Sequence, residues 1–214
     1  MAQKSFSKRE ALRFGWETIK KNFGLIFGLV LVSGVVYYLP SAIQALVGEI
    51  DRVALGIVSS LITIVFWPLQ VAVSLGWMKI SLRFVDGKPS TIQNLFVYWR
   101  YFFKYLIGGL VYSLIVAGGL ILLIIPGIIW SIKFQFWPYF LVDKNLGPIE
   151  AIKASGKLTQ EVKWNLFLLG WLLALINVLG ILALVAGLVV TVPLTMLASA
   201  FVYRQLLKQT PQIK

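Results

Sequence analysis

The stretch 164–203, WNLFLLGWLLALINVLGILALVAGLVVTVPLTMLASAFVY, decides the fold of this 214-residue chain, because its 40 residues include no charged side chain. A helix needs about 20 apolar residues to cross the ~30 Å hydrocarbon core of a bilayer. One helix of this length would extend roughly 60 Å, twice that thickness. We therefore expect two membrane-spanning helices that turn back between Gly180 and Gly187.

Three more uncharged runs precede this one, at residues 22–48, 53–78 and 105–132. The whole chain is 59% hydrophobic and only 13% charged, whereas soluble domains average about 25% charged residues. This composition excludes a soluble globular domain. It predicts an all-α integral membrane protein.

Helix-start signals divide the chain into three approximate repeats, 1–89, 90–147 and 148–214, within a single membrane domain, 1–214. Ser7 with Glu10, and Ser90 with Gln93, have the spacing of a capping box, and Pro148 suits the first position of a helix. We expect each signal to open a cytoplasmic interfacial amphipathic helix that leads into a hairpin, which gives six transmembrane helices. The expected pairs are 23–39 with 53–81, 103–124 with 127–142, and 164–184 with 188–206.

The first two hairpins are expected to have different connections, a loop in the first and a tight turn in the second. Residues 40–52, beginning at Pro40, should form the loop of the first hairpin. The second hairpin should turn tightly at Pro126 and Gly127, since proline and glycine are typical turn residues.

The distribution of basic residues predicts the orientation of the chain in the membrane. With these six spans, 18 of the 20 basic residues fall on one side of the membrane, and basic loops stay in the cytoplasm. We therefore expect both termini to be cytoplasmic. The net charge of +12 then indicates contact with the anionic inner leaflet of the phospholipid bilayer and no nucleic acid. The expected lipid-interface residues are Lys8, Arg9, Arg13, Lys20, Lys21, Arg100, Lys104, Lys153, Lys157 and Lys163.

A binding surface for a soluble partner is the alternative use of these basic helices. Small residues four positions apart, such as Gly24 and Gly28, indicate close helix packing. We expect that packing within the chain, with a homo-oligomer or a membrane protein partner as the alternative.

Several motifs resemble a known family. They are LIIPGIIW at residues 123–130, PYFLVD at 138–143 and PIEAIKAS at 148–155. The chain resembles the membrane domain of some glycerophosphodiester phosphodiesterases and the stand-alone prokaryotic relatives of that domain, whose function is unknown. In the enzymes a separate soluble barrel carries the catalysis, and this sequence shows no counterpart of it. The resemblance therefore implies the membrane fold and a prokaryotic inner (plasma) membrane, without the activity.

Lys133 is the one charge that this topology places inside the membrane, and ionisable residues there are candidates for function. Gln70, Gln135 and Asn177 are polar residues at depth that could line a cavity with it. The alternatives are a lysine that extends to the outer interface or pairs with Glu49 or Asp51, and amides that hydrogen-bond between helices.

Catalytic chemistry has little support in the sequence, because the chain contains no Cys and no His. We find no catalytic residue set, metal site or cofactor motif. The sequence favours a non-enzymatic accessory, scaffold or lipid-interacting module. A small-solute transporter or channel, with Lys133 near the substrate path, is the alternative.

Overall fold

The computed structural model describes residues 4–47, 52–183 and 187–211. Every regular element in these ranges is helical. The α-helices are α1 (Lys8–Lys21), α2 (Phe23–Val47), α3 (Arg52–Val85), α4 (Phe102–Leu122), α5 (Ile124–Phe134), α6 (Trp137–Lys144), α7 (Pro148–Leu158), α8 (Lys163–Leu182) and α9 (Leu188–Lys208), and two 3₁₀ helices are η1 (Ile92–Leu95) and η2 (Val97–Tyr101).

Five segments of the described chain are long and apolar enough to cross a membrane. They are Phe23–Leu46, Gly56–Val85, Ile92–Leu122, Lys163–Leu182 and Leu188–Lys208. Much of their apolar surface faces outward: Leu46 is 86% exposed and Ile121 is 85% exposed. Such side chains would be costly in water and suit contact with lipid. The chain is therefore an all-helical membrane protein.

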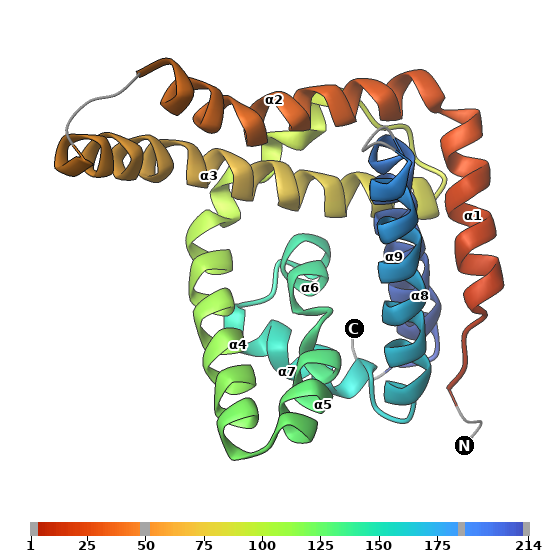
Figure 1. The fold of residues 1–214 in the computed structure, drawn as a ribbon. Coiled ribbons are helices and arrows are strands. Elements are labelled where there is room, and N and C mark those ends of the chain that lie inside the picture. The colour runs from red at the N-terminus through yellow and green to blue at the C-terminus, as the bar shows by residue number, and fades with distance from the viewer. Residues whose placement is uncertain (1–3, 48–51, 184–186, 212–214) are drawn as a thin grey trace.

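The long helices pack in sequential pairs, α2 on α3, α4 on α5 and α8 on α9. Figure 1 shows α2 and α3 running side by side across the ends of the helices that follow them. In the same view α1 lies along α9, so the first and last helices of the described residues are neighbours.

The first expected membrane span, 23–39, is longer in the structure, where α2 continues through Pro40 to Val47. The prediction that a loop begins at Pro40 is therefore wrong. An internal proline removes only one backbone donor, and in an apolar environment the remaining backbone groups have no better partners than the helix itself. Residues 48–51 of the expected loop lie outside the described ranges.

The fourth expected span, 127–142, is interrupted. It forms two short helices, α5 and α6, that meet at Gln135 and Phe136. Pro138, in the first turn of α6, has no N–H to continue the α5 hydrogen-bond ladder. Neither part is long enough to cross a bilayer alone.

The second turn also lies earlier than expected. The chain reverses at Leu123, which has an extended backbone, and Pro126 and Gly127 lie in the first turn of α5. Gly127 allows close helix packing: a Cβ added to Gly119 of α4 would lie 2.9 Å from the Gly127 Cα.

Two of the three expected helix starts are confirmed. Ser7 Oγ accepts a hydrogen bond from the Glu10 N–H at 3.2 Å at the start of α1, and α7 begins at Pro148. The second expected amphipathic helix is wrong, because residues 92–101 form the 3₁₀ helices η1 and η2. The cap there lies one residue later, where Thr91 N–H donates to Asn94 Oδ1 at 3.0 Å.

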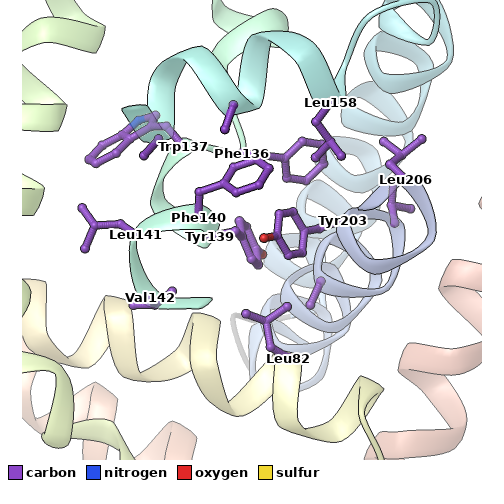
Figure 2. Packing of buried hydrophobic residues seen from close by; sticks show 14 of the residues in the cluster. Leu82, Phe136, Trp137, Tyr139, Phe140, Leu141, Val142, Leu158, Tyr203 and Leu206 are labelled. Atoms are coloured by element: carbon purple, nitrogen blue, oxygen red, sulfur yellow. The ribbon is translucent and has the colours of Figure 1, made fainter. Parts of the chain in front are cut away.

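The larger core cluster surrounds α6. Figure 2 shows Tyr139 and Phe140 directed towards Tyr203 of α9, and each ring centroid lies 5.2 Å from that of Tyr203. Leu82 of α3 and Leu158 of α7 are fully buried in the same cluster. The second half of the interrupted span is therefore interior structure that joins α3, α7 and α9.

Candidate functional site: a lysine-lined pocket beside a helix break

Two hydroxyl groups, of Ser155 in α7 and of Thr159 directly after it, complete the backbone hydrogen bonding at the break between α5 and α6. Ser155 Oγ accepts a hydrogen bond from the Phe136 N–H at 3.1 Å. Thr159 Oγ1 donates to the Lys133 carbonyl oxygen at 2.8 Å, and Ser155 Oγ lies 3.2 Å from the same oxygen. Both side chains are fully buried. The Phe136 N–H and the Lys133 carbonyl oxygen at the break are therefore both hydrogen-bonded, because these hydroxyl groups replace the bonds that a continuous helix would make.

Gly156 brings the α7 backbone close to the end of α5. A Cβ at this position would lie 3.1 Å from Phe134 Cε1 and 3.4 Å from Lys133 Cε. The absent side chain leaves room for the Lys133 stem to pass over α7. As a result, Lys133 reaches the lysines that α7 and α8 carry.

Four lysines meet at one pocket of about 500 Å³. Lys133 comes from the last turn of α5, and Lys163 begins α8. The complete lining is Lys133, Phe134, Lys153, Gly156, Lys157, Gln160 and Lys163. This lining includes no acidic side chain.

These lysines have no acidic partner among the described residues: the four ion pairs of 4–47, 52–183 and 187–211 involve other groups. Lys133 Nζ lies 5.0 Å from the centre of the Phe134 ring, a cation–π contact. Glu49 and Asp51, the alternative partners of Lys133, lie outside the described residues. The pocket therefore concentrates positive charge that those residues do not neutralise.

A hydrogen bond indicates the level of Lys133 along α4. Tyr112 Oη donates to the Ser131 carbonyl oxygen at 3.3 Å. Tyr112 lies ten residues after Phe102, the first residue of α4, or about 15 Å at the helical rise. Lys133 is therefore roughly level with the middle of α4.

The other polar residues expected near Lys133 do not line its pocket. Gln70, on α3, accepts a hydrogen bond at its backbone oxygen from Tyr37 Oη at 3.2 Å. Gln135 is exposed and its Nε2 donates to the Ile132 oxygen at 3.1 Å. Asn177 is half-buried on α8, and its Oδ1 has no hydrogen-bond partner within the described chain.

The expected lipid-interface residues fall into three groups. Lys8, Arg9, Arg13, Lys20 and Lys21 belong to α1, Arg100 and Lys104 flank Tyr101 near the start of α4, and Lys153, Lys157 and Lys163 line the pocket. On α1, Lys20 Nζ lies 5.2 Å from the Trp16 ring centre. Arg13 Nε donates to Glu17 Oε1 at 2.8 Å, and this bond lowers the pKa of Glu17.

A second charged cluster was not expected from the sequence. Arg204 of α9 forms ion pairs with Asp86 and Asp143, at 2.8 and 2.6 Å, and Lys79 Nζ lies 3.8 Å from Asp143. The available signal was the similarity of the segments FVD at 84–86 and LVD at 141–143, which end the first two expected hairpins. The paired charges make this cluster a structural contact between α3, α6 and α9.

None of the protein-family models compared with the sequence matches it, and no solved structure matches it. The chain is similar to uncharacterised mycobacterial proteins. Mb2590 of Mycobacterium bovis and MT2637 of Mycobacterium tuberculosis are each 34% identical to it over 156 residues, which is 72% of this chain and 47% of each relative. The chain thus spans about half the length of the curated relatives it matches.

Proposed function

We propose that the protein is a non-enzymatic integral membrane module that binds anionic phospholipid at the cytoplasmic face of a prokaryotic plasma membrane. The observation that carries this proposal is the outer face of α1. Arg9, Arg13, Lys20 and Lys21 are exposed there, and Trp16 beside them is 47% exposed. Cations next to an exposed tryptophan suit the headgroup region of an anionic leaflet.

The opposite face of α1 supports the same assignment, because protein already covers it. Ala11, Gly15 and Ile19 are buried, and a Cβ at Gly15 would lie 2.8 Å from Leu194 Cδ1 of α9. Helix α9 holds α1 by this buried face and leaves Trp16 and the cations available to lipid.

Contact between the two chain ends supports termini on the same side of the membrane, as the six-span arrangement requires. Ser5 N–H donates to Gln209 Oε1 at 2.9 Å, and Gln209 Nε2 donates to the Ser5 oxygen at 2.8 Å. Ends that touch lie on one side of a membrane, which requires an even number of crossings. The five long segments give an odd number, so we assign the sixth crossing to α5 and α6 together.

Counting bound lipids tests the lipid proposal. The protein would be reconstituted with phosphatidylglycerol and phosphatidylcholine, and the retained lipids counted by native mass spectrometry. We expect Lys20→Gln/Lys21→Gln to retain fewer phosphatidylglycerol molecules, since each cation contributes about 1 kcal/mol at an anionic surface. Lys144→Gln/Lys208→Gln removes the same charge elsewhere and is the matched control. Equal retention by the two double variants would contradict the proposal.

Passage of a small anion is the second candidate function, favoured by the level of Lys133 near the middle of α4. Cations at such depth are typical of solute pathways. Flux of chloride and phosphate into proteoliposomes would be compared for the natural protein and Lys133→Ala. Transport predicts flux that collapses in the variant. Absence of flux in both supports the lipid-binding module.

A further inference from the structure

We propose that the pocket lined by Lys133, Lys153, Lys157 and Lys163 binds a phosphate group with two negative charges. The group belongs either to the headgroup of a phosphomonoester lipid or to a free phosphate. This inference concerns a different surface from the outer face of α1, so either proposal can fail without the other.

The charge of the pocket carries the inference. The helices α5 and α7 both end at this pocket, and each helix C-terminus carries about −0.5 charge. This negative charge would be neutralised by one lysine. The start of α8 offsets one of these ends by about +0.5. The helix ends therefore sum to roughly −0.5 against four positive side chains. Most of the positive charge remains for a ligand to neutralise.

The lining favours a phosphate over other ligand groups. An ammonium group offers three N–H donors on a flexible stem, so four lysines can surround an anion with several oxygens. The amide of Gln160 adds a further polar group, and Phe134 closes one side with an apolar wall. A volume of about 500 Å³ lies within the usual range for small-molecule sites. It accommodates a phosphate together with the first atoms of the group that bears it.

The rigid surroundings of the pocket support specific binding. Lys133 is the last residue but one of α5, and Ser155 and Thr159 fix its backbone through the bonds at the helix break. Lys153 and Lys157 are one turn apart on α7, the helix that carries Ser155 and ends just before Thr159. The same contacts that complete the break thus hold the backbone of three of the four lysines in a fixed arrangement. Preorganised cations bind an anion with a smaller entropic cost than mobile ones.

Calorimetric titration of the full chain in a neutral detergent tests the site. The probes are inorganic phosphate, dihexanoyl phosphatidic acid and, as a control without net charge, dihexanoyl phosphatidylcholine. At pH 8 a phosphomonoester carries about two negative charges. We expect phosphatidic acid, inorganic phosphate or both to bind, and phosphatidylcholine not to bind. Binding of phosphatidic acid alone identifies a lipid as the source, and binding of inorganic phosphate alone identifies a soluble ligand.

Charge-neutral variants locate the binding. Lys133→Gln/Lys157→Gln should weaken it by about tenfold or more, as expected for lost hydrogen bonds to a charged group. Lys144→Gln/Lys208→Gln should leave the affinity nearly unchanged. Lys153→Gln, at an exposed position, provides a variant whose folding is not at risk and should also weaken binding. The inference is overturned if neither phosphate probe binds, or if the pocket and control variants lose affinity equally.

Discussion

The Arg204 guanidinium donates two hydrogen bonds to the Asp143 carboxylate, at 2.6 and 2.8 Å. It also donates two to Asp86, at 2.9 and 2.8 Å. Asp86 directly follows α3 and Asp143 lies in the last turn of α6. One arginine near the end of α9 therefore joins the ends of three helices that are far apart in the sequence.

Replacing this arginine should strongly destabilise the protein. The side chains of Arg204 and Asp143 are only 15% and 7% exposed, so Arg204→Ala leaves a carboxylate with little access to water. We expect a loss of about 3–5 kcal/mol in the free energy of unfolding, measured by denaturant titration in detergent. Arg13→Ala, in a pair whose arginine is 76% exposed, should cost far less, because solvent-exposed ion pairs contribute little to stability. Similar losses for both variants would refute a structural role for the cluster.

Adjacent glycines of α4 provide a matched test of helix packing. A Cβ at Gly119 would lie 2.8 Å from Trp130 Cε3 and 2.9 Å from the Gly127 Cα, whereas one at Gly118 meets nothing within 4 Å. Gly119→Ala should therefore separate α4 from α5 and cost about 1–3 kcal/mol. Gly118→Ala should stabilise the helix by roughly 0.5–1 kcal/mol. Thermal unfolding in detergent would show shifts of opposite sign, and shifts of the same sign would argue against this packing.

The hydroxyl of Ser155 should be essential for the helix break. Ser155→Ala leaves the Phe136 N–H without its acceptor in a fully buried position, which costs about 1–3 kcal/mol. Ser199 is a suitable control, because its Oγ lies 2.8 Å from the Thr195 oxygen one turn away on the same helix. We expect denaturant titrations to show a substantial loss for Ser155→Ala and a small change for Ser199→Ala. If the two variants are equally stable, α7 does not hold the break.

Membrane topology can be read with single cysteines, because the natural chain has none. Ser5→Cys and Lys208→Cys should both resist a membrane-impermeant maleimide in intact cells and react after lysis. Arg52→Cys, at the start of α3 and before the span Gly56–Val85, should react in intact cells. Labelling of only one terminus would indicate an odd number of crossings and exclude the six-span assignment.

Much of the helical framework is predictable from the sequence, since the length of an uncharged run and the chemistry of a cap are local properties. The apolar run at 164–203, the cap at Ser7 and the helix start at Pro148 correspond to observed helices and helix starts. The break before Pro138 is different. Its stability depends on Ser155 and Thr159, and no local pattern indicates that these residues reach back to Lys133.

The candidate site likewise combines a residue that the local sequence indicates with residues that only tertiary packing brings together. Lys133 is conspicuous in the sequence because it is the one cation within an apolar run. Its neighbours are not predictable from that run, since Lys153 and Lys157 lie about twenty residues further along the chain and meet Lys133 only when α7 packs on α5. Arg204, Asp86 and Asp143 are likewise brought together by three separate helices.

The contact between Ser5 and Gln209 joins residues 204 positions apart, which has a consequence for biosynthesis. Helix α1 leaves the ribosome before α9, yet its packing surface at Ala11 and Gly15 is covered by α9. That surface has no partner until α9 has been synthesised. The bundle can therefore close only after the ribosome has finished α9, and a nascent chain that stops before Leu188 keeps α1 undocked.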